Sequence, residues 1–249
     1  MSIAMNMALI ERASAAVQSH FRISQDTYMA YLNMSLDSPE FGTERGLLEF
    51  SNKLKHLPTV RFSSLMEDFD ALQNSAISDA DMELRDMDQT VRKMLQARAT
   101  QCWDDLRAQE QRERAAVVNH YRNLALRVRR MRVAGDSLTS AVVTLRRPFN
   151  KRVLYEFTDR SGRSWRSLSY VRATVRWAMI SNYNETMLFM LAKAGDELAV
   201  IHHVDSSHPS HGMVISVSGK ILGITEYETI KKEKFHPNSR ALIARKPAV

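Results

Sequence analysis

Residues 106–134 read LRAQEQRERAAVVNHYRNLALRVRRMRVA, and this stretch decides the fold of the amino-terminal part of the chain. It contains neither glycine nor proline, the two residues that break helices most strongly. Apolar side chains recur three or four positions apart, at Val117, Tyr121, Leu124, Val128 and Met131. This spacing is typical of one face of an α-helix, and it predicts that this face is packed.

The helical pattern extends well beyond this stretch. No glycine occurs in residues 47–134, and no proline occurs in residues 59–147. Two further groups of apolar residues recur at helical spacing: Leu65, Phe69, Leu72 and Ala76, then Leu84, Met87, Val91 and Leu95. Residues 1–19 and 23–36 have a helical pattern too. The sequence therefore predicts an all-α region that ends at about residue 145.

Two positions are predicted to delimit the long helix. Ser78, followed by Asp79 and Asp81, resembles a helix N-terminus, where a capping hydroxyl and negative charge are favourable. Gly135 is the first plausible C-cap after the apolar stripe. The helix is therefore expected to begin near Ser78 and to continue as far as Met131.

From Arg152 onward the pattern becomes typical of strands and turns. Residues 153–158 and 163–168 are rich in β-branched, aromatic or alternating residues, and they flank turn residues at 159–162. This arrangement predicts a β-hairpin.

The remaining carboxy-terminal residues predict a mixture of helix and strand. A helical pattern over 170–194, ended by Gly195, precedes a strand over 198–201. The inward face of that helix is expected at Val171, Val175, Ala178, Tyr183 and Leu188. Residues 213–217 and 221–224 flank a short turn and predict a second hairpin.

The expected fold class is α+β: a long-helix domain over residues 1–148, followed by a small α+β domain with hairpins over residues 149–249. The chain has 249 residues, with 44% hydrophobic and 25% charged residues, which excludes disorder throughout. Its single cysteine, Cys102, cannot form an intrachain disulfide, so a reducing compartment is expected. No apolar run reaches the length of a membrane span, and we expect neither a signal peptide nor an anchor.

The charge, +7 overall, is divided into two blocks along the chain. Residues 67–88 hold eight acidic residues and one basic residue, whereas residues 106–152 hold twelve basic and three acidic residues. Arginine dominates the second block, and its planar guanidinium suits bidentate contact with phosphate or carboxylate. The candidate contacts to nucleic acid are Arg122, Arg127, Arg129, Arg130, Arg132, Arg146, Arg147, Lys151 and Arg152.

Two interpretations of this basic block stay open. Contact with double-stranded DNA would be non-specific, because the sequence holds no zinc finger, ribonucleoprotein aromatic motif or clear helix-turn-helix. Alternatively, the arginines form a solvated helix face, or they pair with the acidic block of the same chain or of a neighbour.

No motif in the sequence specifies an enzyme. Gly-x-Ser-x-Gly, Walker A and Gly-x-Gly-x-x-Gly patterns are missing. Five histidines lie in the last fifth of the chain: His202, His203, His208, His211 and His236. A His-rich loop can hold zinc, but these residues lack the paired spacing of strong metal signatures. We therefore expect no metal, no cofactor and no catalytic constellation.

Short carboxy-terminal motifs occur in a recognisable order. FTDRSGRSW at 157–165 precedes SYVR at 169–172, which opens a helix, and FHPNSR follows at 235–240. This order resembles the carboxy-terminal region of tailed-phage minor capsid proteins, related to Mu-type head-morphogenesis proteins. The resemblance covers about residues 153–245, and its motif residues are Asp159, Gly162, Arg163, Trp165, Tyr170, His208, His236, Pro237, Asn238 and Arg240.

The resemblance implies a non-enzymatic structural virion protein that acts in head morphogenesis. Such a protein is found in the virion head, and in the host cytoplasm during assembly, as part of a multi-copy assembly. Its implied partners are the phage portal or major capsid protein, together with packaged DNA. A scaffolding or head-tail connector protein without DNA contact is the first alternative.

Three departures from the family pattern affect what is expected of the site. Ser239 stands where the family usually has cysteine, Ala241 where a second histidine or cysteine is common, and Met213 near another expected cysteine. Any metal site of the relatives is therefore expected to be lost here. Residues 236–240 are expected to form a structural turn, in which Pro237 fixes the backbone and Asn238 caps or bonds its neighbours.

A second alternative is an enzyme that uses NAD. Some relatives of these head proteins are joined to ADP-ribosyltransferase-like toxins. Under that hypothesis the residues to suspect are Arg163, Tyr170 and Glu185.

Overall fold

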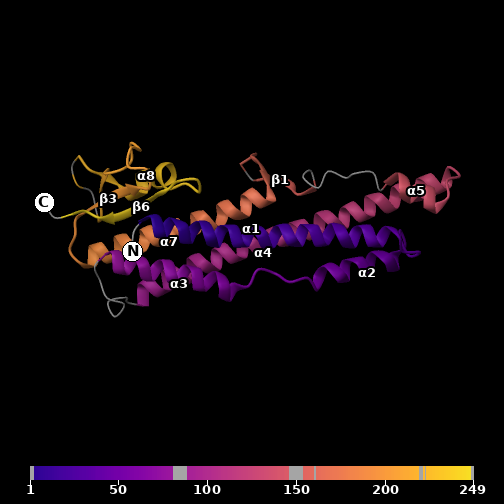
Figure 1. Ribbon diagram of the computed structural model, residues 1–249, viewed down its shortest axis with the longest axis horizontal. Helices are drawn as coiled ribbons and strands as arrows, with labels where there is room; N and C mark the ends of the chain where they lie inside the picture. Colours follow the sequence, from indigo (N-terminus) through magenta and orange to yellow (C-terminus); the bar gives the residue numbers. More distant parts are fainter. Residues whose placement is uncertain are drawn as a thin grey trace. The chain divides into compact units, whose positions relative to one another are not determined.

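The structure is a computed structural model that describes residues 3–80, 89–145, 154–159, 161–218, 221 and 223–247 (Figure 1). Its helices are α1 (Ile3–Leu36), α2 (Glu44–Lys55), α3 (Phe62–Asp79), α4 (Gln89–Val133), α5 (Leu138–Leu145), α7 (Ser167–Lys193) and α8 (Tyr227–Lys234). Its strands are β1 (Glu156–Thr158), β2 (Ser164–Arg166), β3 (Leu198–His203), β4 (Val214–Ser216), β5 (Thr225–Glu226) and β6 (Ala241–Arg245). The fold class is α+β, as the sequence predicts, with long helices first and the strands in the carboxy-terminal region.

The stretch 106–134 lies almost entirely within the long helix α4. Its predicted inward face is buried at Val117, Tyr121, Leu124 and Val128, and partly buried at Met131. Gly135 follows the helix with a φ of +103°, a left-handed conformation that favours glycine. The Asp136 N–H donates to the Met131 carbonyl over 3.0 Å, which completes a Schellman cap. The predicted C-cap is therefore confirmed.

The predicted helix start at Ser78 is wrong. Ser78 lies in the last turn of α3, and the N–H of the C-cap residue Ala80 donates to the Ala76 carbonyl over 3.0 Å. Asp79 accepts hydrogen bonds from the Asn6 amide and the Tyr183 hydroxyl. These tertiary bonds and the buried apolar stripe of α3 outweigh the local capping preference. Residues 81–88, which include the predicted stripe positions Leu84 and Met87, lie outside the described residues.

The chain forms two compact units, each assembled from separate segments. Unit 1 comprises residues 1–17, 61–105 and 171–249, and unit 2 comprises residues 18–60 and 106–170. Each unit draws on residues from both sides of the predicted boundary at 148/149. That boundary itself lies outside the described residues.

Unit 1 contains a four-stranded sheet in the order β5-β4-β3-β6. β3 pairs antiparallel with β4 and with β6, so Ile201 lies opposite Ile243 in the register. Both isoleucines are fully buried. The predicted inward face of α7 is buried at Val171, Val175, Ala178 and Tyr183, and partly buried at Leu188.

The predicted second hairpin is wrong. β4 has β3 as its antiparallel partner, and β5 runs parallel to β4. The Ile224 N–H donates to the Ile221 carbonyl over 3.0 Å, and Gly223 has a φ of +79°. The described residues of this run, 221, 223 and 224, therefore belong to a turn and do not pair as a strand. Residues 219, 220 and 222 of the predicted hairpin lie outside the described residues.

Strand β6 and helix α8 have no counterpart among the predicted elements. β6 pairs with β3 along five residues, so it is an integral part of the sheet. The Asn184 amide oxygen on α7 accepts a hydrogen bond from the Ile243 N–H over 2.9 Å. This bond joins the sheet to α7 within unit 1.

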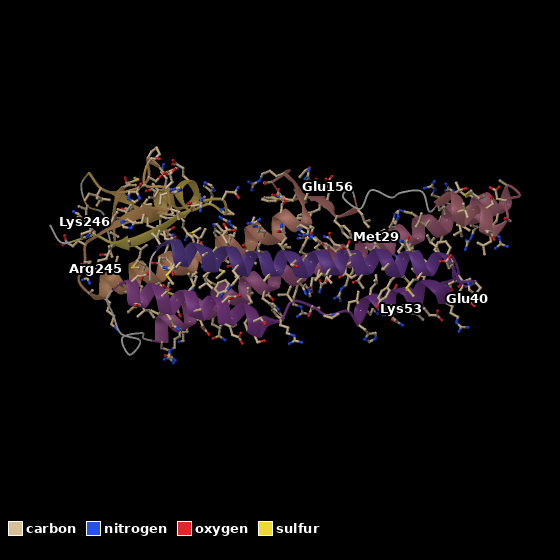
Figure 2. All side chains as sticks on the ribbon, in the orientation of Figure 1. Met29, Glu40, Lys53, Glu156, Arg245 and Lys246 are labelled. Carbon is tan, nitrogen blue, oxygen red and sulfur yellow. The ribbon has the colours of Figure 1, made fainter. Side chains whose placement is uncertain are left out.

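Unit 2 is held by a core around Tyr121. The Tyr121 ring stacks on Phe50 with a centroid distance of 4.9 Å, and it meets Phe41 edge-on at 4.9 Å. Met29 on α1 belongs to the same buried cluster (Figure 2). Thr43 caps α2, because its hydroxyl accepts a hydrogen bond from the Gly46 N–H over 3.1 Å.

Candidate nucleic-acid interface

The carboxy-terminal half of α4 carries exposed arginines on the sides of the helix that its buried stripe leaves to solvent. The arginine face comprises Arg122, Arg127, Arg129, Arg130 and Arg132, all of which are exposed. The buried stripe fixes the orientation of the helix, because Tyr121 and Leu124 must face the core of unit 2. The positions that carry arginine then face solvent.

The arginine face lacks acidic partners within the described part of the chain. Arg122 donates to the Asn119 amide oxygen over 3.1 Å. In residues 3–80, 89–145, 154–159, 161–218, 221 and 223–247, no carboxylate lies within ion-pair distance of Arg127, Arg129, Arg130 or Arg132. The pairing of these arginines with acidic residues of their own chain is therefore not seen among the described residues.

Arginines earlier in the same block have a different environment. Arg114 donates to the Tyr28 hydroxyl over 3.3 Å and to the Leu57 carbonyl over 3.4 Å. Arg112 donates to Gln109 and lies over the Phe157 ring at 5.1 Å. These two arginines join elements of unit 2, in contrast to the exposed side chains of the arginine face.

The helix itself favours cations at this end. Arg130 and Arg132 lie in the last turn of α4, where the carbonyl ends of the peptide dipoles accumulate negative charge. Their charge therefore stabilises the helix on which they are displayed.

The other candidate contacts, Arg146, Arg147, Lys151 and Arg152, lie outside the described residues.

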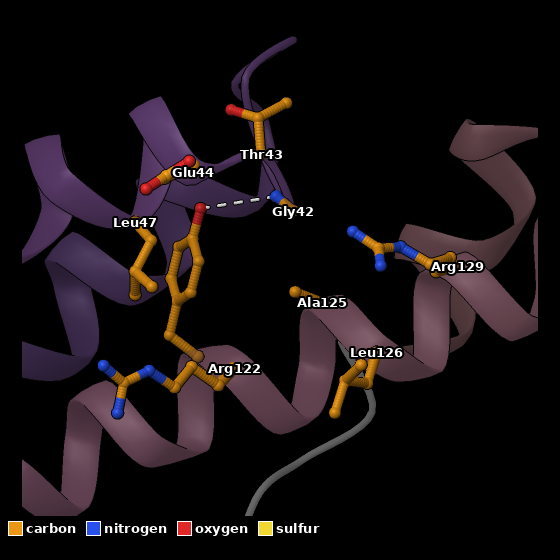
Figure 3. A pocket seen from close by; sticks show the side chains of 9 residues that line it. Gly42, Thr43, Glu44, Leu47, Arg122, Ala125, Leu126 and Arg129 are labelled. Atoms are coloured by element: carbon orange, nitrogen blue, oxygen red, sulfur yellow. Dashed lines mark hydrogen bonds between the residues drawn. The ribbon is translucent and has the colours of Figure 1, made fainter.

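A groove of about 390 Å³ lies where α2 begins, and two residues of the arginine face, Arg122 and Arg129, line it (Figure 3). Its lining residues are Gly42, Thr43, Glu44, Leu47, Tyr121, Arg122, Ala125, Leu126 and Arg129. The Gly42 N–H donates to the Tyr121 hydroxyl over 3.4 Å, which holds the loop before α2 against α4. Burial raises the pKa of Tyr121 above its ordinary value. The sequence did not predict the groove, because no motif marks the residues at the start of α2 that form its other side.

The predicted first hairpin is confirmed, although its strands are shorter than expected. Phe157 pairs with Trp165 in an antiparallel register. The Asp159 carboxylate accepts hydrogen bonds from the Ser161 hydroxyl and the Trp165 indole over 2.6 and 2.9 Å. These bonds, with those from backbone N–H groups, hold the pKa of Asp159 well below its usual range.

The other hairpin residues of the resemblance gather around the same turn. Gly162 has a φ of +81°, which a non-glycine residue adopts only with strain. Arg163 donates to the Ser161 hydroxyl, and its guanidinium lies 5.9 Å from the centre of the Trp165 ring. The Tyr170 ring meets Trp165 edge-on at 5.8 Å. The motif residues of the hairpin thus stabilise a turn.

The predicted turn at residues 236–240 is confirmed. The Asn238 N–H donates to the His236 ring nitrogen over 3.2 Å, and the Ser239 hydroxyl donates to the Lys234 carbonyl over 2.6 Å. The Arg240 carbonyl accepts a hydrogen bond from the Val204 N–H. Among the described contacts the turn is bonded through His236 and Ser239 rather than through the Asn238 side chain.

The histidines near β3 form stacked pairs. His203 and His208 stack with a centroid distance of 4.0 Å, and His202 and His211 stack at 5.2 Å. Burial lowers the pKa of His202, and His211 lowers it further. No group of three or more metal-ligating side chains with the geometry of a metal site occurs in the part of the chain that the structure describes.

The residues suspected under the enzyme hypothesis have structural partners. Glu185 accepts hydrogen bonds from Arg98 over 2.5 Å and from Lys231 over 2.8 Å. Both cations are themselves largely buried, so this carboxylate belongs to an ion network within unit 1. Arg163 and Tyr170 lie in the hairpin cluster of unit 2.

Comparisons with known proteins add no family to this picture. No family model, curated protein or solved structure matches the chain. Among the helices of the described ranges, none has the length and apolar character required to cross a membrane. The candidate function therefore rests on the residues and their geometry.

Proposed function

We propose that this chain is a non-enzymatic structural protein that contacts double-stranded DNA through the arginine face of α4. The observation that carries the proposal is the exposure of these five arginines without acidic partners among the described residues. Exposed guanidinium groups along a helix suit phosphate oxygens along a nucleic-acid backbone. Their spread around the helix favours contact with several phosphates at once.

The contact is expected to be independent of DNA sequence. Base recognition requires side chains placed at base edges by a recognition element in a groove, and no such motif occurs in the sequence. The large aromatic residue nearest the arginine face, Tyr121, is buried in the core and is not available for stacking with bases. The proposal is therefore backbone binding with a strong dependence on salt.

The biological setting that we propose is the head of a tailed phage. The ordered motifs at 157–165, 169–172 and 235–240 support a minor capsid role, in which the protein meets the portal or major capsid protein in several copies. Both motif-bearing turns are well bonded, at Asp159 and at Ser239, which suits structural elements. Such a protein would act in assembly and lie beside packaged DNA.

The test is the binding of the full chain to a random-sequence 30-base-pair duplex at several salt concentrations. The variant replaces Arg127, Arg130 and Arg132 with glutamine, which removes three charges from exposed positions. If each arginine neutralises one phosphate, the slope of log K against log salt falls by about 2.7 in magnitude. Affinity at low salt falls with it, whereas the unfolding midpoint changes little.

A matched control replaces Arg61, Arg92 and Lys93, which are also exposed, with glutamine. This variant carries the same net charge as the first, so general electrostatic attraction is lowered equally. An equal loss of affinity in both variants would contradict a specific role for the arginine face. If the unmodified chain does not bind the duplex at low salt, the DNA-binding proposal is wrong. The alternative that then stands is a scaffolding or head-tail connector protein, which makes no contact with DNA.

A further inference from the structure

The groove beside the arginine face combines an apolar floor with two charged ends. Leu126 is 50% exposed although its neighbours Tyr121 and Leu124 are buried. Leu47 lies opposite on α2 and is partly buried. An aliphatic side chain placed between Leu47 and Leu126 would remove apolar surface of both from water.

The two arginines of the groove are in line with each other. Arg122 and Arg129 are seven residues apart, which on an α-helix places them about 10.5 Å apart and only about 20° apart around the axis. Figure 3 shows them on either side of Ala125, with Glu44 on the α2 side of the groove. None of these three charged side chains has an ion-pair partner among the described residues.

We propose that this groove binds an amphipathic helix of a partner protein that carries two carboxylates two turns apart. A second helix packed along α4 has the same rise per residue, so its acidic side chains at positions i and i+7 match the spacing of Arg122 and Arg129. Its aliphatic side chain at i+3 or i+4 enters the apolar floor beside Leu126.

Charge argues for a protein helix over nucleic acid in this groove. Glu44 lines the α2 side and repels a continuous row of phosphates. A helix instead places its carboxylates on one edge only, and its other edge faces Glu44 with neutral or basic residues. Arginine also binds carboxylates in the bidentate mode that gives such a pair its geometry.

This site uses Arg122 and Arg129 of the arginine face, so the DNA contact proposed above is left to the other three arginines of that face. Arg127, Arg130 and Arg132 do not line the groove. On a helix, Arg127 lies about 140° around the axis from Arg122. Variants of the two arginine sets therefore distinguish a failure of this inference from a failure of the DNA-binding proposal.

The test uses a fluorescein-labelled 18-residue peptide of helix-forming sequence, with glutamate at positions 6 and 13, leucine at 9 and 10, and lysine on the opposite edge. Binding to the full chain is measured by anisotropy, and the amide shifts of Gly42 and Leu126 are followed by NMR. Replacement of Arg122 and Arg129 with glutamine is expected to weaken binding by about tenfold, as two partly exposed ion pairs are lost. Leu126→Ser is expected to weaken binding as well, because it removes the apolar contact.

Controls make each outcome decisive. The Arg127, Arg130 and Arg132 variant is expected to bind the peptide within about twofold of the unmodified chain, because these arginines do not line the groove. A peptide with glutamine at positions 6 and 13 is expected to bind about tenfold more weakly. The inference is overturned if the glutamine peptide binds as tightly as the glutamate peptide. It is overturned as well if the NMR shifts of the Gly42 and Leu126 amides do not change when the chain is saturated with the glutamate peptide. It is also overturned if duplex DNA shifts the same two amides and displaces the peptide, since the groove would then be a phosphate site.

Discussion

The guanidinium of Arg176 on α7 donates to the main-chain carbonyl of Ser239, over 3.3 Å, in the turn that precedes β6. The same group donates to the carbonyl of Pro237 and to the carboxylate of Glu11 on α1. Arg176 is only 7% exposed. One buried side chain thus joins three segments of unit 1 that are far apart in the sequence.

Replacement of Arg176 with alanine is expected to lower the free energy of unfolding by about 3 kcal/mol. The change leaves two carbonyls without their donor and removes a buried charged partner from Glu11. Urea unfolding followed by circular dichroism measures the effect. Arg172→Ala is the control, because Arg172 is more exposed and, among the described residues, bonds Glu11 alone, so its loss is expected to cost less than about 1 kcal/mol. Equal effects would show that Pro237 and Ser239 do not depend on Arg176.

The contacts of Arg176 with the turn at 236–240 illustrate what sequence patterns can and cannot predict. The turn at 236–240 follows from Pro237 and its polar neighbours, and local chemistry is enough to expect it. Its attachment to Arg176 depends on a contact across sixty residues, which no local pattern records. For the same reason the parallel partner of β4 was not predicted, whereas the caps at Gly135 and Gly195 follow from one residue each.

The helix that carries the arginine face also has some features that the sequence predicts and others that it does not. Helical spacing predicts that Tyr121 and Val128 are buried, and the exposure of the intervening arginines follows. The engagement of Arg112 and Arg114 with other elements does not follow, since it depends on the positions of Phe157 and Tyr28. The groove depends on where α2 packs against α4, which no local sequence pattern predicts, so it is seen in the structure alone.

Glu113 makes the stability of the chain depend on pH near neutrality. Burial raises the pKa of this carboxyl from 4.5 to about 7, although hydrogen bonds from Ser167 and Gln25 lower it. Because the folded pKa lies above the unfolded value, this contribution to stability is complete below pH 4.5 and falls as the pH rises to 7. The loss above pH 7 is about 3 kcal/mol.

The measurement compares Glu113→Gln with the unmodified chain by urea unfolding between pH 4.5 and 8. Glutamine does not ionise, so the stability of the variant relative to the unmodified chain is expected to rise by about 3 kcal/mol across this range. Glu49→Gln is the control, because Glu49 is exposed and its ion-pair partner among the described residues is the exposed Arg45. A constant difference between Glu113→Gln and the unmodified chain at all pH values would contradict the expected titration.

Cys102 is expected to resist thiol reagents in the folded protein. Burial raises the pKa of its thiol from 9.0 to about 12, and the nearby Asp105 contributes to the same direction. At pH 8 the thiolate population is then about 1,000-fold smaller than for an ordinary cysteine, and the reagent must also reach a buried sulfur. Ellman's reagent is expected to react slowly with the native chain and rapidly in urea. Rapid reaction without urea would mean that this part of α4 opens readily.

Gly46 and Gly135 are expected to respond differently to alanine, for different physical reasons. A Cβ at Gly46 would lie 2.2 Å from the Glu40 carbonyl oxygen and 2.9 Å from the Tyr121 hydroxyl, so the start of α2 must move away from the loop at Glu40 and from α4. We expect Gly46→Ala to cost about 3 kcal/mol and to disturb the groove. At Gly135 the space is open, and only the φ of +103° opposes a side chain, so Gly135→Ala is expected to cost about 1 kcal/mol. Urea unfolding of both variants tests the order, and a smaller effect at Gly46 than at Gly135 would mean that the α2 start adapts without strain.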